Sequence, residues 1–168
     1  FSLELIRCNA LDCGLVQLRH STPTDILYER YFYRSGINQT MIDNLKEIVD
    51  QAILKVAVAE NDIVLDIGCN DGTLLKNFSN TNIEYLGFEP SESVANEAIK
   101  NNINTVNVFF NKKNIENFKN FKNKTDVICA ANVVCHVPDL NDLIATTETL
   151  LSSKGVFVFE EPYLGSMF

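Results

Sequence analysis

The stretch Ile63-Val-Leu-Asp-Ile-Gly-Cys-Asn-Asp-Gly72 constrains the fold of this chain more than any other. It begins as an apolar run of the kind that forms a buried parallel strand. It then changes into a turn containing glycine and acidic residues, and a helical pattern follows. In open α/β sheets, the turn at the carboxyl end of such a strand is where nucleotides and nucleotide-like cofactors bind. The stretch therefore predicts a parallel sheet with a small-molecule site at its edge.

Patterns typical of strands and helices alternate along the rest of the chain. Strands that alternate with helices form right-handed crossovers, which give a parallel sheet with helices on both faces. We therefore expect a Rossmann-like α/β fold. The expected strands are 63–67, 84–89, 105–109, 126–131 and 155–160, and the expected helices are 73–79, 91–101, 113–120 and 139–151.

Two features precede this alternating region. Residues 3–18 suggest a small hairpin around a cysteine turn, and residues 23–35 an aromatic-rich connector. From Met41 to Val58, apolar residues recur at spacings of three and four, which predicts a lead helix with one buried stripe.

Composition and charge exclude several classes of protein. The chain has 168 residues, of which 46% are hydrophobic, enough for one globular core. It has no run of about 18 apolar residues that would span a membrane and no secretion signal at its start, which favours a cytoplasmic location. The net charge of −8 would repel nucleic acid. We therefore expect a small-molecule partner rather than nucleic acid or a membrane.

The five cysteines are an odd number without a secretion signal, which argues against a disulfide framework. Cys69, Cys129 and Cys135 lie in apolar runs and are expected in the core. Cys8 and Cys13 resemble half of a zinc knuckle, because they place two thiolates on a short turn followed by glycine. A closed structural zinc site needs four ligands. Either a second pair lies before the first residue, or the site has decayed.

Both ends of the chain suggest a fragment of a longer protein. The first residues look like a strand already under way, and the strand at 155–160 is followed only by an exit loop. The alternative is a compact natural domain with apolar ends. We divide the chain into a partial zinc-binding segment and connector (1–35), a lead helix (36–58) and a Rossmann-like domain truncated at its C-terminus (59–168).

The turn after the first strand also indicates which cofactor to expect. A dinucleotide fingerprint is Gly-x-Gly-x-x-Gly, which lets the backbone approach a pyrophosphate. Here Asn70 occupies the middle glycine position and no third glycine is in register. Asn tolerates positive φ, so the tight turn is retained, but Asp71 would face a phosphate with like charge. A cationic cofactor without phosphate, S-adenosylmethionine, fits better.

An acidic residue ends the second expected strand. Glu89 lies 23 residues after Asp66, and a carboxylate about 20 residues beyond the glycine turn is where ribose hydroxyls are bound. The simpler interpretation is an acid at a helix N-terminus, stabilised by the helix dipole. The two features together favour the ribose role.

Five segments, in order, resemble the class I S-adenosylmethionine C-methyltransferases that act on deoxysugar nucleotides. They are Cys13-Gly-Leu-Val-Gln-Leu18, Tyr31-Phe-Tyr-Arg-Ser-Gly36, Val64-Leu-Asp-Ile-Gly-Cys-Asn-Asp-Gly-Thr-Leu-Leu75, Ala131-Asn-Val-Val-Cys-His-Val-Pro-Asp139 and Glu160-Glu-Pro-Tyr-Leu164. The resemblance covers nearly the whole chain. It implies C-methylation of a keto-deoxysugar nucleotide, in a protein with an N-terminal zinc-binding segment.

The same resemblance implies a set of cofactor-binding residues. The turn would face the methionine end, the acid of the second strand would hold the ribose, and the lead segment would close over the cofactor. Phe109 to Asn111 are candidates for the adenine edge. The expected residues are Tyr33, Ser35, Asp66, Gly68, Asn70, Gly72, Glu89, Pro90 and Asn132.

His136 is the candidate catalytic residue. C-methylation beside a ketone requires removal of a proton from carbon, and an imidazole with a near-neutral pKa suits that transfer. The alternative is a structural histidine with satisfied hydrogen bonds. By the resemblance, the main base would come from a Tyr-His-Glu-His-type segment shortly after the Glu-Pro-Tyr strand exit, but neither that segment nor the family's large acceptor domain occurs before Phe168. A fragment of this kind should bind the cofactor better than it turns over a substrate.

Other functions stay open at this level. The methyl acceptor could be oxygen or nitrogen of another small molecule, or the domain could bind the cofactor without chemistry. An NAD-dependent oxidoreductase is disfavoured by the altered glycine pattern.

Overall fold

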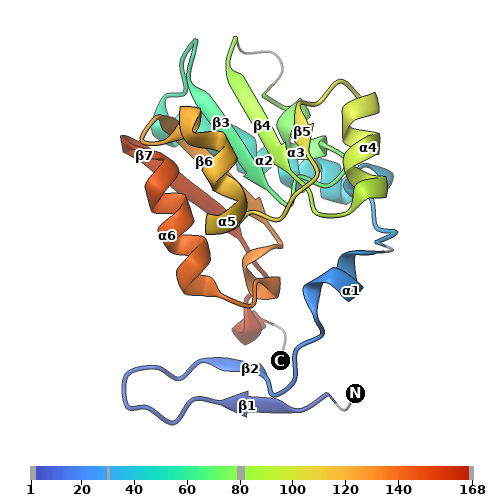
Figure 1. The fold of residues 1–168 in the computed structure, drawn as a ribbon, viewed down its shortest axis with the longest axis vertical. Helices are drawn as coiled ribbons and strands as arrows, with labels where there is room; N and C mark the ends of the chain where they lie inside the picture. The colour runs from blue at the N-terminus through green and yellow to red at the C-terminus, as the bar shows by residue number, and fades with distance from the viewer. Residues whose placement is uncertain (1–2, 30, 79–81, 167–168) are drawn as a thin grey trace.

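The structure is a computed structural model that describes residues 3–29, 31–78 and 82–166. Its centre is a five-stranded parallel sheet with the order β5-β4-β3-β6-β7 (Figure 1). The α/β Rossmann-like fold expected from the sequence is thereby confirmed. The strands are β3 (Ile63–Ile67), β4 (Glu84–Phe88), β5 (Thr105–Val106), β6 (Thr125–Ala131) and β7 (Leu151–Glu160).

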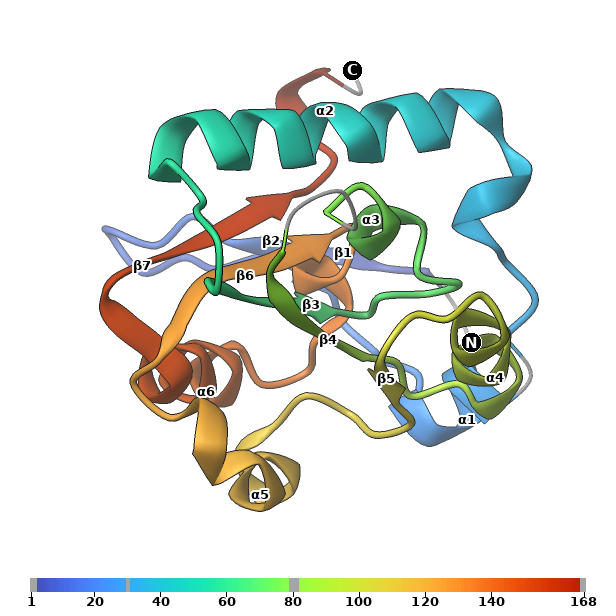
Figure 2. The ribbon, with the colours of Figure 1, turned by 90° about the horizontal axis from the view of Figure 1, so that it is seen from above.

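Helices cover both faces of this sheet (Figure 2). On one face, α2 (Gln39–Val56) and α3 (Thr73–Lys76) pack against Val64 and Val127 of the strands. On the other face, α5 (Lys112–Ile115) and α6 (Leu140–Leu150) pack against Leu65 and Ile128. Neighbouring residues of β3 and β6 point to opposite faces, so each strand contributes to both cores. A further helix, α4 (Glu92–Lys100), connects β4 to β5.

The lead helix α2 follows the predicted stripe closely. Leu45, Val49 and Ala52 are buried at spacings of four and three. The helix begins two residues earlier than expected, because the side chain of Asn38 accepts a hydrogen bond from the Thr40 amide and caps it. It ends at Val56, before Ala57 turns left-handed with a φ of 51°.

Several predicted boundaries differ from the structure. The expected strand 105–109 ends at Val106, because the Asn107 side chain donates to the carbonyls of Glu89 and Pro90 and takes the chain away from β4. The expected helix 113–120 becomes α5 followed by a 3₁₀ segment, Glu116–Phe121. The expected helix 73–79 ends at Lys76, and residue 79 lies outside the described residues.

Part of the predicted connector is also helical. The short helix α1 (Thr24–Glu29) buries none of its residues, so its sequence carries no apolar stripe that could have revealed it. Of the chain ends, residues 1–2 and 167–168 lie outside the described residues. None of the described helices is long and apolar enough to cross a membrane.

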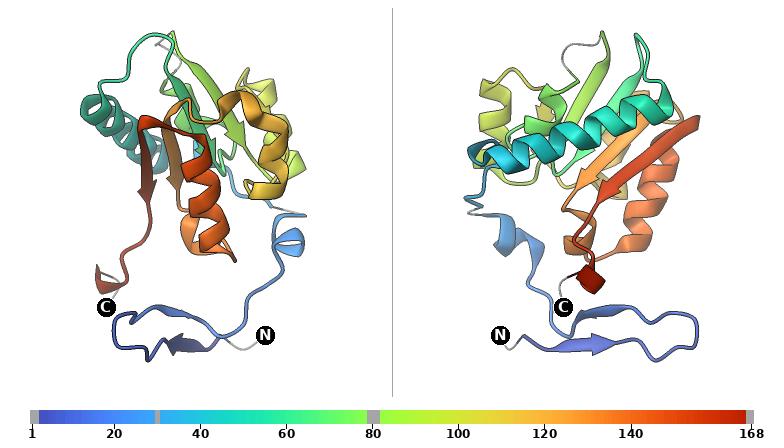
Figure 3. Two further views of the ribbon diagram at one scale, coloured as in Figure 1. Left: turned by 60° about the vertical axis from the view of Figure 1, so that its left-hand side comes forward. Right: turned by 180° about the vertical axis from the view of Figure 1, so that it is seen from behind.

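The N-terminal hairpin stands apart from the sheet (Figure 3). Strands β1 (Leu5–Arg7) and β2 (Val16–Leu18) pair antiparallel, as predicted for residues 3–18. Leu5 is 63% exposed and Leu18 is 44% exposed. The hairpin therefore lacks the two-sided burial that stabilises the parallel sheet.

Candidate functional site

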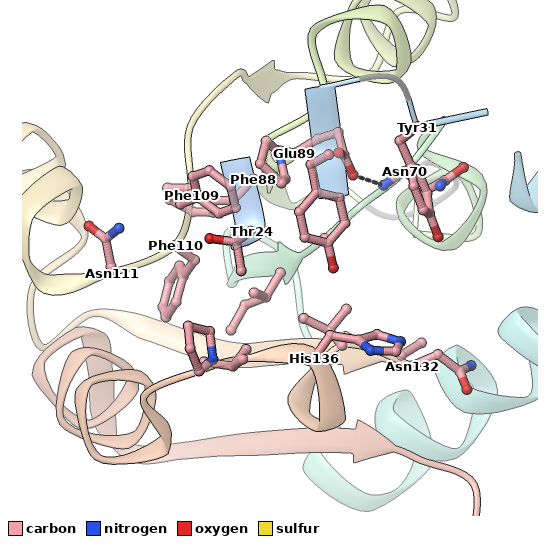
Figure 4. Close-up of a pocket in the computed structure, with 18 of the residues that line it drawn as sticks. Thr24, Tyr31, Asn70, Phe88, Glu89, Phe109, Phe110, Asn111, Asn132 and His136 are labelled. Carbon is pink, nitrogen blue, oxygen red and sulfur yellow. Dashed lines mark hydrogen bonds between the residues drawn. The ribbon is translucent and has the colours of Figure 1, made fainter. Parts of the chain in front are cut away.

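A cavity of about 1060 Å³ lies at the carboxyl edge of the sheet, where the turns after β3, β4 and β6 meet the connector (Figure 4). Its size suits a cofactor or a drug-sized ligand. Strand order reverses between β3 and β6, and open α/β sheets bind their ligands at such a switch point. The predicted site residues that line the cavity are Tyr33, Ser35, Gly68, Asn70, Glu89, Pro90, Asn132 and His136.

Two predicted cofactor residues are placed differently. Asp66 is buried inside β3 and Gly72 is the N-cap residue before α3, and neither lines the cavity. Burial raises the pKa of Asp66 well above its ordinary value of 3.8, and the nearby charge of Glu89 adds to that rise. Asp66 therefore lies beneath the turn, as a carboxyl in a largely apolar setting.

The turn after β3 has the left-handed backbone that its sequence predicts. Gly68, Asn70 and Gly72 have φ values of 67°, 53° and 83°. A Cβ on Gly68 would lie 2.7 Å from Cγ2 of Val133, and one on Gly72 would lie 2.6 Å from Cγ1 of Ile103. Both glycines are thus required by backbone conformation and by space.

Asn70 joins three parts of the site. Its backbone amide donates to Oε2 of Glu89 at 3.1 Å, and its side-chain Oδ1 accepts from the backbone amide of Ser35 at 2.9 Å. Its Nδ2 donates to the Tyr33 carbonyl at 3.3 Å. A glycine at this position could not make the two side-chain bonds, so the Asn-Asp-Gly form of the turn fastens the lead segment to the glycine loop.

Asp71 does not face the ligand cavity, contrary to its expected position inside the loop, and only 6% of it is exposed. Its carboxylate accepts from the Gly36 amide at 2.8 Å and from the Thr73 hydroxyl at 2.6 Å. Its carboxylate thus caps the lead segment and the start of α3.

Glu89 is buried at the end of β4, where it is only 3% exposed. Oε1 accepts from the Ser91 amide at 2.8 Å, and Oε2 accepts from Asn70. Burial raises the pKa of Glu89, while these two hydrogen bonds and the charge of Arg34 act in the opposite direction. Each oxygen keeps a further lone pair, so the carboxylate is oriented and can still accept a bond from a ligand hydroxyl.

The loop after β6 lies across the cavity from Glu89 (Figure 4). Asn132 has a φ of 56°, and its Nδ2 donates to Oε2 of Glu160 at 2.9 Å. His136 is exposed at the end of a 3₁₀ turn, Val134–His136. Cys135 in the same turn is exposed, so its predicted core placement is wrong. That turn lies past the end of the buried strand.

The predictions missed several aromatic residues of the cavity, among them Tyr28 on α1. Its ring centroid lies 5.9 Å from that of Phe109 and 5.4 Å from that of Tyr31. Burial raises the pKa of Tyr28 to about 12, so it stays a neutral phenol at physiological pH. The aromatic-rich composition of residues 23–35 was the one signal for this wall. The predicted segment Phe109 to Asn111 also lines the cavity.

Cys8 and Cys13 lie in the exposed hairpin. The Leu15 backbone amide and the neighbouring Cys8 lower the pKa of Cys13. Within the described parts of the chain, no three His, Cys, Asp or Glu side chains gather so as to hold a metal ion. Two thiols are half of a four-ligand site, so the hairpin by itself does not make a closed zinc site.

A parallel sheet, a glycine turn after its first strand and an oriented acid after its second define a Rossmann-like cofactor-binding domain. The chain belongs to the methyltransferase domain family, whose family model matches residues 33–166.

The curated C-methyltransferase NovU of Streptomyces niveus is 24% identical to this chain over 164 residues. The match covers 98% of this chain and 39% of NovU, so the chain spans well under half of that relative's length.

Solved methyltransferase structures share the fold. The plantazolicin methyltransferase BpumL, solved with SAH and a pentazolic desmethylPZN analog, superposes with a TM-score of 0.60 at 20% identity, over 74% of this chain and 48% of its own. An S-adenosylmethionine-dependent methyltransferase from Clostridium acetobutylicum gives 0.58 at 18% identity, over 70% and 49%. These likenesses establish the fold of the chain.

Proposed function

We propose that this domain binds S-adenosylmethionine in the cavity at the carboxyl edge of the sheet and serves the C-methylation of a keto-deoxysugar nucleotide. The cofactor supplies an electrophilic methyl group on a sulfonium. The observation that carries the proposal is the pair of Asn70 and Glu89, which places a buried, oriented carboxylate 3.1 Å from the glycine turn. Membership of the methyltransferase family and the similarity to a C-methyltransferase support it.

The residues present fit this cofactor. The carboxylate of Glu89 has lone pairs left for ribose hydroxyls, and Pro90, Phe109 and Phe110 offer apolar surface beside it for an adenine ring. Gly68 has no side chain to fill the space near Val133. Asp25, Glu89, Asp139 and Asp142 line the cavity together with Lys112 and Lys113, a balance of charge that favours a cationic methyl donor.

We assign His136 the removal of a proton from the acceptor carbon next to the ketone. Its imidazole lines the cavity on the side of Asn132, across from Glu89. An imidazole at this position can accept the proton as a general base. Asn132 borders the same part of the cavity, where its amide can orient the methyl donor.

Zinc binding by Cys8 and Cys13 is the second part of the proposal taken from the resemblance. The two thiols would supply half of a tetrahedral site. The described residues do not supply the other ligands.

The activity test uses the intact protein, S-adenosylmethionine with a labelled methyl group, and a panel of nucleoside-diphosphate keto-deoxysugars in D₂O. We expect the label on a carbon next to the ketone, together with exchange of hydrogen for deuterium at that carbon. His136→Ala should lower both rates by at least about 100-fold. His20→Ala, in the exposed residues after the hairpin, is the matched control and should keep the wild-type rates.

Label on oxygen or nitrogen would refute C-methylation and retain a methyltransferase. Binding of the cofactor without transfer to any acceptor in the panel would favour a cofactor-binding module. Wild-type deuterium exchange in His136→Ala would remove this residue from the proton transfer.

A further inference from the structure

The two acidic residues at the end of β7 and just beyond it hold the loop that carries His136. The backbone carbonyl of Glu160 accepts from the backbone amide of Asn132 at 2.8 Å, and the side-chain Oε2 of Glu160 accepts from Asn132 Nδ2 at 2.9 Å. These bonds connect the exits of two neighbouring parallel strands, β6 and β7. Glu160 thus extends the sheet pairing by one residue.

Glu161 makes a different kind of contact. A single oxygen, Oε1, accepts from the amides of Val133 at 2.8 Å and Val134 at 2.6 Å. Successive backbone amides that converge on one anion form a nest, and a charged acceptor roughly doubles the strength of each bond. The 3₁₀ turn Val134–His136 has no side-chain cap of its own. Glu161 provides that cap from the residue after β7.

The second oxygen of Glu161 shows that this contact does not maximise stability. Oε2 is buried and has no N–H or O–H donor among the described residues. A buried carboxylate oxygen that lacks such a donor destabilises a fold. Partial burial of the Cys135 thiol, and then its hydrogen bond with Glu161, raise the pKa of Cys135 to about 12, so it remains a neutral thiol beside this carboxylate.

We propose that Glu161 is a positioning residue, which fixes the loop from Asn132 to His136 so that the imidazole of His136 lines the cavity. Without the carboxylate, two amides at the start of the 3₁₀ turn would lose their acceptor, and the turn would open to other conformations. The proposal rests on the proposed function, because the orientation of His136 matters only at a methyl-transfer site.

The test measures hydrogen–deuterium exchange of the intact protein without ligand. The peptide spanning residues 132–138 contains the two amides, and the peptide spanning residues 63–67 reports on the sheet. We expect Glu161→Ala to accelerate exchange in 132–138 by at least about tenfold, and Glu161→Gln, which retains a neutral acceptor, by about threefold. Glu148→Ala, an exposed glutamate on α6, is the matched control and should exchange at the wild-type rate.

A second readout follows His136 itself. Exchange of its Cε1 hydrogen against pH gives the titration midpoint of the imidazole. We expect that midpoint to move in Glu161→Ala and to return toward wild type in Glu161→Gln, while the Kd for SAH stays within about threefold. The Gln variant carries the test if the Ala variant does not fold.

Unchanged exchange in 132–138 in either variant would overturn the proposal. Acceleration that extends equally to 63–67 would also overturn it, because Glu161 would then support the fold as a whole. Failure of the wild-type protein to bind SAH would refute the proposed function instead, and the exchange comparison would still be read without ligand.

Discussion

The parallel sheet and the N-terminal hairpin use similar local devices with different results. Both contain a glycine with a left-handed backbone, Gly68 at a φ of 67° and Gly14 at 66°. Around Gly68, neighbouring strands, α3 and the lead segment bury the polar groups of the turn and fix their directions. Around Gly14 the nearest side-chain atom, Nη2 of Arg7, lies 3.6 Å from the position of a Cβ. Similar local geometry becomes a binding site only where tertiary packing supports it.

The largest expected difference between the two regions lies in stability. Leu65→Ala removes a fully buried side chain of β3 and should lower the free energy of unfolding by about 3 kcal/mol. Leu18→Ala, in β2, removes a side chain that is 44% exposed and should cost less than about 0.5 kcal/mol. Urea denaturation followed by circular dichroism measures both. Equal losses would show that the hairpin is an integral part of the core.

The paired glycines sharpen the comparison further. Gly68→Ala adds a strained left-handed backbone and a contact of 2.7 Å with Val133, so it should destabilise the sheet domain by about 2 kcal/mol. Gly14→Ala has the same backbone strain, but its Cβ would meet only Arg7 at an ordinary contact distance of 3.6 Å, and the unfolding midpoint of the sheet domain should not move. A shift of that midpoint in Gly14→Ala would contradict the independence of the two regions.

Asp66, the buried carboxyl beneath the turn after β3, predicts that the stability of the sheet domain depends on pH. Burial raises the folded-state pKa of Asp66 well above 3.8, so the folded state holds a proton that the unfolded state releases above about pH 4. The stabilisation by this proton is complete below the unfolded-state pKa and is lost as the pH rises through the folded-state value.

Asp66→Asn should remove that dependence. Urea titrations between about pH 4 and 8 should show the stability of the wild type falling relative to the variant as the pH rises. A difference that stays constant, or one that grows in the opposite direction, would show that Asp66 is ionised in the folded protein.

The smallest effect is expected in the hairpin. Replacing Cys8 and Cys13 together with Ser should leave the unfolding midpoint of the sheet domain within about 0.5 kcal/mol of wild type, because both thiols are exposed. Metal analysis of the same two proteins tests the zinc half-site. A loss of bound zinc accompanied by a large loss of sheet stability would show that the metal couples the stability of the hairpin to that of the sheet domain.

The same contrast explains what the sequence could reveal. The spacing of hydrophobic residues predicted both ends of β3 correctly and both ends of α2 to within two residues, because these patterns are local. The positive φ of Asn70 also followed from residue type. Asp71 was misread because its acceptor role depends on Gly36, which lies 35 positions away. Tyr28 and the Glu161 contacts are likewise long-range and leave no periodic signal.

Calorimetric titration of the intact protein with SAH tests the central claim, that the cavity binds the methyl donor through Glu89. We predict one site with a Kd of about 10 μM or tighter, weakened at least about tenfold in Glu89→Gln and unchanged in the exposed control Glu92→Gln. A wild-type protein that gives no binding heat at about 1 mM SAH, or a Glu89→Gln variant that binds as tightly as wild type, would contradict the account.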